Sequence, residues 1–509
     1  MFSRVHSLGL LGIDGYAVEV EADIAKGLPG FDVVGMPGPA VKESRDRVRA
    51  AMKNCGFSFP VSHITINLAP ADVKKEGSIY DLPLFLSLLC ATEQASLKLD
   101  NMAFVGELSL TGEVRAVHGV LPMVIAARKA GLDTVFIPKE NAAEGAVVDG
   151  ITVYAVDHVK ALLAHLSGEK LLEKLPKTEF HPHADGRVPD FADVMGQLVP
   201  RRAMEIAAAG NHNILLVGPP GSGKSMLAKR LPSILPDMTR EEALEATSVH
   251  SIVGALPADV GLLSSRPFRS PHHTVSVVGL TGGGAVPRPG EVSLAHNGVL
   301  FLDELPEFSR QATEGLRQPL EDQHVTISRA SGSLTYPCSF MLVAAMNPCP
   351  CGYYGHPTRE CTCSPNAVTR YLSRISGPLL DRFDLHVEVP PVGYSDLNAN
   401  EPAENSASIR ERVNAARRVQ LERYARTRIR TNSQLTPSLL RRHCALSDDA
   451  HALMESAFER LGLSARAYDR LLKVARTIAD LDGSEKLRIE HLSEAIQYRS
   501  LDRKYWQAR

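Results

Sequence analysis

The feature that most constrains this chain is a glycine-rich segment of eight residues in the middle of the sequence. It has the spacing G-x-x-x-x-G-K-S and consists of Gly218, Pro219, Pro220, Gly221, Ser222, Gly223, Lys224 and Ser225. An apolar run precedes it and helix-prone residues follow it, so we expect a strand, a loop and a helix in that order. Glycines allow backbone N–H groups to turn towards phosphate oxygens, and a helix N-terminus adds partial positive charge. The segment therefore predicts a site for ATP, in which Lys224 reaches the β- and γ-phosphates and the Ser225 hydroxyl binds Mg²⁺. The alternative is a glycine-rich turn with an unrelated lysine.

Two further apolar runs end in polar residues, as buried parallel strands do at the edge where ligands bind. Residues 298–302 lead into Asp303 and Glu304. After a phosphate-binding loop, this pattern predicts that Asp303 helps to hold Mg²⁺ and that Glu304 polarises the attacking water. The alternative is a strand that ends in two capping acids. Residues 340–346 lead into Asn347, which resembles the sensor residue of AAA+ ATPases that contacts the γ-phosphate or the water.

The segment around Arg382 resembles the arginine-finger segment of ring ATPases. An arginine from a neighbouring subunit stabilises the charge that develops on the γ-phosphate, an effect of about 10³–10⁵ in rate in related systems. We expect Arg382 to have this role, with Arg370 and Arg374 as alternatives. A surface ion pair with Asp381 or Asp384 is the other interpretation of Arg382.

The chain from residue 409 onward has a helical pattern that is rich in arginine. Ten arginines, no lysine and two glutamates between Arg410 and Arg442 give this stretch a local net charge of +8. Three interpretations are open: a solvated helix face, pairing with a neighbouring subunit, and contact with a polyanion. Arg466, near the start of an expected helix, resembles the second sensor arginine that reaches the γ-phosphate from the helical lid, and Arg470 lies one turn further along.

Two insertions interrupt the ATPase pattern. Residues 270–291 are rich in glycine and proline, and residues 323–336 are expected to form a β-hairpin just before the sensor strand. This pair resembles the insertions of the magnesium chelatase and MCM branch of AAA+ proteins, which project into the pore of a ring. The resemblance implies that Arg329, His272 and His273 contact a threaded or encircled DNA substrate. The alternative is that they are ordinary exposed loop residues.

Four of the eight cysteines are clustered in the pattern C-x-C, nine residues, C-x-C. The thiolates of Cys349, Cys351, Cys361 and Cys363 could complete a tetrahedral Zn²⁺ site, which would be structural because four protein ligands leave no open position. The more common zinc spacing is C-x-x-C, so reduced free cysteines are the alternative.

The first 165 residues alternate between strand and helix patterns without a cofactor motif, and predict a mixed α/β domain. This domain resembles the proteolytic domain of Lon in residues 106–114, 126–131 and 137–141. A Lon protease needs a serine nucleophile and a lysine base, because a serine without an activating base is a weak nucleophile. Leu121 stands at the position of the base and cannot accept a proton, and Ser78 lies near the nucleophile position but outside the protease pattern. We therefore expect a Lon-like domain without protease chemistry.

Charge and hydropathy limit where the protein acts. The net charge of -2 gives no general attraction to nucleic acid or membranes, so such binding would need local patches. The apolar run 82–90 is far shorter than the ~20 residues of a membrane span, and the N-terminus lacks the pattern of a signal peptide. We therefore expect a cytoplasmic protein without membrane contact. The expected organisation is a Lon-like domain at 1–165, a linker at 166–189, an ATPase core at 190–395, a linker at 396–407 and a helical lid domain at 408–509.

The layout as a whole resembles the bacterial YifB/ComM family of magnesium chelatase-related AAA+ proteins. The resemblance covers essentially the whole chain and rests on the combination of the glycine-rich loop, the Phe-Leu-Asp-Glu strand end, the Cys-Pro-Cys-Gly segment and the arginine-rich helices. It implies an α/β chain with a Lon-protease-like (ribosomal S5 domain 2-like) N-terminal domain, an AAA+ P-loop core of the Mg-chelatase/MCM branch and a C-terminal helical lid domain.

The same resemblance implies a homo-hexameric helicase that uses ATP and Mg²⁺ to drive branch migration during natural transformation. Its substrate would be double-stranded or branched DNA, with single-stranded DNA and recombination proteins as further partners to consider. Two other hypotheses remain open. One is the ATPase subunit of a metal-insertion complex, and the other is a protein remodeller with a non-catalytic Lon-like domain.

Overall fold

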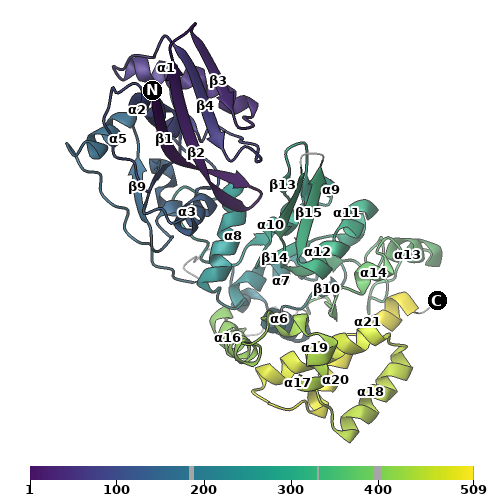
Figure 1. The fold of residues 1–509 in the computed structure, drawn as a ribbon. Coiled ribbons are helices and arrows are strands. Elements are labelled where there is room, and N and C mark those ends of the chain that lie inside the picture. The colour runs from purple at the N-terminus through teal and green to yellow at the C-terminus, as the bar shows by residue number, and fades with distance from the viewer. Residues whose placement is uncertain (183–187, 330–331, 394–402, 508–509) are drawn as a thin grey trace. The chain divides into compact units, whose positions relative to one another are not determined.

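The computed structural model of the chain describes residues 1–182, 188–329, 332–393 and 403–507. The chain folds into two compact units, each built from more than one stretch of sequence (Figure 1). The first unit contains Met1–His181, Ala243–Leu263 and Ser328–Tyr336, and the second contains Pro182–Glu242, Ser264–Ile327 and Pro337–Arg509. Two segments of the expected ATPase core at 190–395 therefore pack with the first unit.

A seven-stranded sheet forms the centre of the first unit, with the strand order β3-β4-β2-β1-β5-β8-β9. Its strands are β1 (Phe2–Leu11), β2 (Asp14–Ala25), β3 (Gly30–Val34), β4 (His63–Ala69), β5 (Met102–Phe104), β8 (Thr134–Pro138) and β9 (Thr152–Val156). The pairs β1·β2 and β2·β4 are antiparallel, and the other neighbours are parallel. Buried and more exposed residues alternate along β4, as in a strand with one face on the core.

Helices and a small hairpin complete the first unit. They are α1 (Pro39–Asn54), α2 (Asp81–Ala91), α3 (Val120–Lys129), α4 (Ala142–Gly145) and α5 (Val159–Leu166), with the hairpin β6 (Glu107–Leu108) and β7 (Val114–Arg115). The helix α2 is buried along nearly its whole length, which explains why most of its residues are apolar. The expected linker at 166–189 begins inside this unit, because the Leu175 N–H donates to Val153 O at 3.0 Å.

A five-stranded parallel sheet forms the centre of the second unit, with the order β11-β14-β17-β10-β18. Its strands are β10 (Ile214–Val217), β11 (Phe268–Arg269), β14 (Val299–Leu302), β17 (Met341–Met346) and β18 (Leu385–Glu388). Every residue of β10, β14 and β17 is buried, as expected for parallel strands covered on both faces. The carboxyl ends of the strands therefore bring the residues that follow them to one edge of the sheet.

Short elements connect these strands and carry the insertions. They are α6 (Leu198–Gly210), α7 (Lys224–Arg230), α8 (Arg240–Ile252), α9 (Val277–Thr281), β12 (Gly282–Gly283), β13 (Arg288–Pro289), α10 (Glu291–Leu294), α11 (Arg310–Gly315), α12 (Arg317–Asp322), β15 (His324–Arg329), β16 (Gly332–Pro337), α13 (Pro365–Leu372) and α14 (Gly377–Leu380). The two expected insertions are thus α9–β12–β13–α10 and the hairpin β15–β16.

The C-terminal part is helical and shares a core with the sheet of the second unit. Its helices are α16 (Ser406–Arg423), α17 (Pro437–His443), α18 (Asp448–Leu461), α19 (Ala465–Leu481), α20 (Ile489–Gln497) and α21 (Ser500–Asp502). Side chains of α16 and α19 belong to the same buried cluster as those of α6 and β10. The helix α16 begins at Ser406, with Asn405 as its N-cap, and so starts inside the segment expected as the linker 396–407. Residues 396–402 of that segment lie outside the described residues.

Several arginines of the basic stretch 410–442 are used inside the second unit. Arg412 binds Glu205 at 2.6 Å, and Arg423 binds Asp480 at 2.9 Å. Arg417 is buried and donates to the carbonyl oxygens of Ala208 and Ala209. Part of the local charge of +8 therefore joins α16 to α6 and α19, whereas six of the ten arginines are exposed, namely Arg418, Arg426, Arg428, Arg430, Arg441 and Arg442. In the part of the chain that the structure describes, no helix has both the length and the apolar surface to cross a bilayer.

Candidate ATPase site

The glycine-rich loop lies between β10 and α7, at the carboxyl end of β10, the strand between β17 and β18 in the parallel sheet. Gly223, the N-cap of α7, has φ +90°, a left-handed conformation that glycine adopts without strain. Lys224 is buried, and its Nζ donates to Gly218 O at 2.9 Å, Pro219 O at 2.8 Å and Asn347 Oδ1 at 3.1 Å. Burial lowers the pKa of Lys224 to about 8, against the raising effect of the carboxylates of Asp303 and Glu304. The ammonium group of Lys224 is thus held at the loop by three oxygen acceptors. The oxygens of a bound phosphate can take the place of these acceptors.

The two expected Mg²⁺ ligands meet at the same edge. Ser225 Oγ donates to Asp303 Oδ2 at 2.6 Å, although Ser225 lies in α7 and Asp303 follows β14. A hydroxyl and a carboxylate side by side are the oxygen ligands that P-loop NTPases offer to Mg²⁺. The backbone N–H of Glu304 donates to Asp303 Oδ1 at 3.0 Å, which fixes the carboxylate from its other side.

Unlike the adjacent Asp303, which is half-buried, Glu304 has an exposed side chain. Its backbone is left-handed, with φ +54°, and its side chain is 62% exposed. A carboxylate that is solvated and next to the Mg²⁺ ligands can accept a proton from water, which is the chemistry expected of the hydrolytic base. Asn347 follows β17, and the register Val217↔Met346 places it level with the first residue of the glycine-rich loop.

His273 lies beside Glu304, with 3.8 Å between Nδ1 and the carboxylate Oε2. The parallel register explains this, because β11 and β14 pair as Arg269↔Leu300 and both residues stand four positions further along. The ring of His273 contacts that of His272, with 4.1 Å between centroids and 34° between the ring planes. The sequence predicted both histidines as DNA contacts; the structure places His273 beside the carboxylate of Glu304.

Arg382 lies in a cluster of arginines in the second unit. Its guanidinium forms an ion pair with Glu321 of α12, and its side chain is only 14% exposed. Burial and the nearby positive charges of Arg470, Arg466 and Arg317 lower the pKa of Arg382. The charges that act on Lys224 are those of Asp303 and Glu304, so the two cations have different electrostatic surroundings.

The other candidate arginines have distinct positions. Arg374 binds both oxygens of Glu307 at 2.9 Å, and Arg370 is exposed on α13. Arg470 is buried and lies 3.8 Å from Asp381 and 3.9 Å from Asp384. Arg466 is exposed in the first turn of α19, near Arg382 rather than among the groups that surround Lys224.

Arg329 is the last residue of β15, and its side chain is exposed. The returning strand β16 carries Leu334, which lies against Gly12 in the turn between β1 and β2: a Cβ built on Gly12 would be 3.5 Å from Leu334 Cδ2. Both residues belong to the first unit, so residues 332–336 of the hairpin pack with the sheet of that unit.

Gln197 makes contacts with the glycine-rich loop that the sequence did not indicate. It stands at the N-cap of α6 with φ +55°, and its Nε2 donates to Ser222 O at 3.3 Å and to Pro390 O at 2.6 Å. The side chain thus connects the glycine-rich loop to the end of β18. A lone glutamine before a helix has no distinguishing pattern, so only the three-dimensional structure reveals this contact.

The four clustered cysteines come together in space. Their sulfur atoms all lie within 4.8 Å of one another, with 3.3 Å between Cys349 and Cys351, 3.7 Å between Cys349 and Cys361, and 3.5 Å between Cys351 and Cys361. A disulfide requires about 2.05 Å, so these are thiols. Cys349 is buried, and the others are partly exposed.

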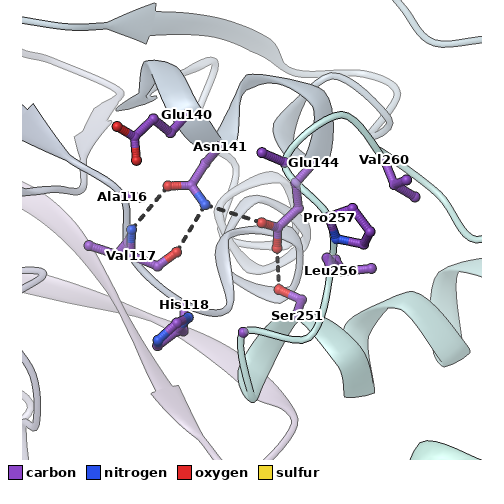
Figure 2. A pocket seen from close by; sticks show the side chains of 12 residues that line it. Ala116, Val117, His118, Glu140, Asn141, Glu144, Ser251, Leu256, Pro257 and Val260 are labelled. Carbon is purple, nitrogen blue, oxygen red and sulfur yellow. Dashed lines mark hydrogen bonds between the residues drawn. The ribbon is translucent and has the colours of Figure 1, made fainter.

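The residues at the expected protease positions of the first unit have other partners. The Leu121 N–H donates to Glu144 Oε1 at 2.7 Å, and Ser78 Oγ donates to Glu107. Glu144 also accepts from Ser251, which lies in the segment Ala243–Leu263 (Figure 2). Figure 2 shows that Asn141 bridges both backbone groups of Val117 beside this pair, at 3.0 and 2.9 Å. A pocket of about 190 Å³ is lined in part by Val117, Asn141, Glu144 and Ser251.

Family models match three consecutive parts of the chain. Residues 190–397 match the family model "Magnesium chelatase, subunit ChlI", residues 20–141 match "Subunit ChlI of Mg-chelatase" and residues 403–499 match "Magnesium chelatase, subunit ChlI C-terminal". The chain also resembles the Lon protease of Mycolicibacterium smegmatis, with 31% identity over 140 residues, which is 26% of this chain and 18% of that protein.

Two full-length relatives decide the family. The protein YifB of Escherichia coli (strain K12) is 46% identical over 504 residues, which is 98% of this chain and 97% of the relative. Competence protein ComM of Haemophilus influenzae (strain Rd) is 44% identical over 508 residues, again 98% of this chain and 97% of the relative. With the Lon-like first unit, the parallel sheet and the glycine-rich loop in place, the chain belongs to the YifB/ComM family of magnesium chelatase-type AAA+ ATPases.

Proposed function

We propose that this protein is an ATP-dependent DNA motor, a homo-hexameric ring that drives helicase or branch-migration activity in recombination during natural transformation. The observation that supports the proposal is the pairing of Arg382 with Glu321 of α12, whereas Lys224 contacts Gly218, Pro219 and Asn347. In ring ATPases such an arginine completes the site of the neighbouring subunit, here the site formed by Lys224, Ser225 and Asp303. The relative ComM is named a competence protein, which supports DNA as the substrate.

The role of each residue follows from its position. ATP would bind over residues 218–225, with Lys224 and Asn347 at the γ-phosphate. Ser225 and Asp303 would hold Mg²⁺, which supplies Lewis-acid stabilisation of the phosphates when bound. Glu304 would take a proton from the attacking water.

The arginines would act across the subunit boundary. Arg382 would stabilise the transition state in the site of the adjacent subunit, and Arg466, which lies close to it, would act from the same side. Hydrolysis would then change the contact between subunits and move the lid helices. The hairpin with Arg329, together with His272 and His273, would pass this movement to DNA in the pore.

Two further parts of the proposal concern cofactors and place of action. The four cysteines 349, 351, 361 and 363 would bind one structural Zn²⁺, since four thiols within 4.8 Å match a closed tetrathiolate site. A motor that acts on chromosomal or incoming DNA would work in the cytoplasm, with recombination proteins as partners.

ATPase assays with different polymers test the proposal. We expect double-stranded, branched or single-stranded DNA to raise the turnover rate, and the stimulation to fall steeply between 50 and 200 mM salt, roughly with a slope of -0.9 per neutralised phosphate. The ring should form with ATP and Mg²⁺, as seen by electron microscopy with a slowly hydrolysed ATP analogue. Stimulation by a misfolded protein, with every DNA inert, would instead support a protein remodeller, which the Lon-like first unit favours as the second candidate.

A further inference from the structure

The four-cysteine cluster has the geometry of a closed metal site. Four thiolates at 2.3 Å from one tetrahedral Zn²⁺ stand about 3.8 Å apart. The measured separations of 3.3 to 3.7 Å among Cys349, Cys351 and Cys361 are close to this value, and Cys363 completes the set. The backbone N–H of Tyr354 donates to Cys349 Sγ at 3.3 Å, a hydrogen bond that stabilises a thiolate ligand.

The loop that carries the first two cysteines touches the phosphate loop directly. Gly352, immediately after Cys351, has φ +85°, and a Cβ built on it would overlap the Cδ of Pro220. The backbone of Gly352 therefore packs against the ring of Pro220. Pro220 lies in the glycine-rich loop, two residues before Ser222. A movement of this loop would therefore displace Pro220 and, with it, the residues of the glycine-rich loop that bind the phosphates.

The start of the loop is joined to the same site by a second route. Cys349 follows Asn347 by two residues, and Asn347 Oδ1 accepts from Lys224 Nζ at 3.1 Å. Cys349 is fully buried in the same apolar cluster as Met346, the last residue of β17. This apolar cluster thus fixes the end of β17, the strand that positions Asn347.

The end of the loop leads towards the arginine cluster. Cys363 is followed by Ser364, the N-cap of α13, whose hydroxyl accepts from the Ala367 N–H at 3.3 Å. Tyr371 of α13 and Leu379 of α14 are buried in the apolar cluster that contains Cys349. Arg382 stands two residues after the last residue of α14.

We propose that the tetrathiolate centre, with one Zn²⁺ bound, is a positioning device that couples the two halves of the ATPase cycle within one protomer. It holds Pro220 and Asn347 against the nucleotide of this protomer, and it anchors the α13–α14 segment that presents Arg382 to the next. The inference rests on the proposed ATPase site but not on the nature of the polymer that the motor moves along.

The contact at Gly352 can be tested without touching a metal ligand. In the Gly352→Ala protein, relief of the overlap with Pro220 requires a shift of about 1 Å, and a displacement of that size weakens a preorganised site up to about 10²-fold. The matched control is Gly355→Ala, in the same loop and with a similar positive φ of +75°, where the nearest atom to the new Cβ is Lys504 Cε at 3.5 Å. We expect both full-length variants to retain about one zinc per chain, and only Gly352→Ala to weaken binding of a fluorescent ADP analogue.

Removal of the metal provides the second measurement. A thiol-blocking mercurial should release about one Zn²⁺ per chain, read with a zinc-sensitive dye, and nucleotide affinity should fall in step with release. Cys361→Ser should behave like the metal-depleted protein, whereas Cys90→Ser, which changes a cysteine outside the cluster, should leave zinc content and nucleotide affinity unchanged.

Each outcome decides one point. Protein purified without chelators that contains no zinc but binds nucleotide normally would overturn the metal centre. Zinc-loaded Gly352→Ala protein that binds nucleotide as well as Gly355→Ala would overturn the coupling. Failure of the ATPase assignment itself would appear elsewhere, as unchanged hydrolysis in Lys224→Ala protein that still holds its zinc.

Discussion

An arginine that serves the neighbouring subunit can be recognised by mixing two inactive proteins. Arg382→Ala should lower kcat by about 10³–10⁵, equivalent to about 4–7 kcal/mol of transition-state stabilisation. The effect on folding should be much smaller. The ion pair between Arg382 and the half-exposed Glu321 contributes about 0–1 kcal/mol, and the nearby arginines oppose it. A large kinetic effect with a nearly unchanged melting temperature is therefore expected.

The decisive assay mixes Arg382→Ala with Lys224→Ala protein in equal amounts. In a ring with one site per boundary, a site works when the Arg382→Ala subunit supplies the phosphate loop and the Lys224→Ala subunit supplies the arginine. Random mixing produces this arrangement at about one quarter of the boundaries, so turnover should recover to about a quarter of the wild-type value.

The matched control mixes Lys224→Ala with Glu304→Gln, two changes on the same side of the boundary. Every intact phosphate loop then belongs to a subunit without its carboxylate, so turnover should not recover. If the first mixture also stays inactive while the rings form normally, Arg382 does not act in trans and the assignment fails.

Four other predictions concern single residues of the site. Lys224→Ala should lose at least about tenfold in affinity for a fluorescent ATP analogue, because a charge-assisted contact with phosphate contributes about 1.5–3 kcal/mol; normal turnover would contradict its role. Glu304→Gln should bind ATP with unchanged affinity but hydrolyse it about 10²–10⁴-fold more slowly, and a normal single-turnover rate would place the base elsewhere. Ser225→Ala should shift the Mg²⁺ dependence of hydrolysis to higher concentrations, and an unshifted titration would argue against a metal ligand. His273→Ala should change kcat more than KM, because the ring faces Glu304 rather than the phosphate loop; a change in KM alone would contradict this.

Local patterns were enough to predict the parts of the site that depend on short stretches of chain. The glycines at 221 and 223 occupy left-handed positions that few other residues adopt, and the apolar runs before 218 and 303 are the buried strands that the sequence indicates. These features are fixed by backbone conformation and burial, which neighbouring residues determine. The fold class follows from them and from the Lon-like segments.

Contacts between distant elements could not be predicted in the same way. The approach of His273 to Glu304 depends on the parallel register of β11 and β14, which pairs residues 31 positions apart. The surroundings of Arg382 depend on Glu321 and Arg466, which come from helices far away in the sequence. Likewise, the basic stretch 410–442 gave three interpretations, because its ion pairs with Glu205 and Asp480 appear only when the helices pack.

The segment Ala243–Leu263 leaves one unit in sequence and completes the other in space. Its buried Ser251 is held by Glu144, and its Gly261 packs against Ala143. A gene that lost the codons for the first 181 residues would still encode this segment, now without the surface that covers it. Modular exchange of the Lon-like part during evolution is thereby obstructed, since neither part can be inherited, swapped or deleted as a continuous piece of DNA without damage to the other.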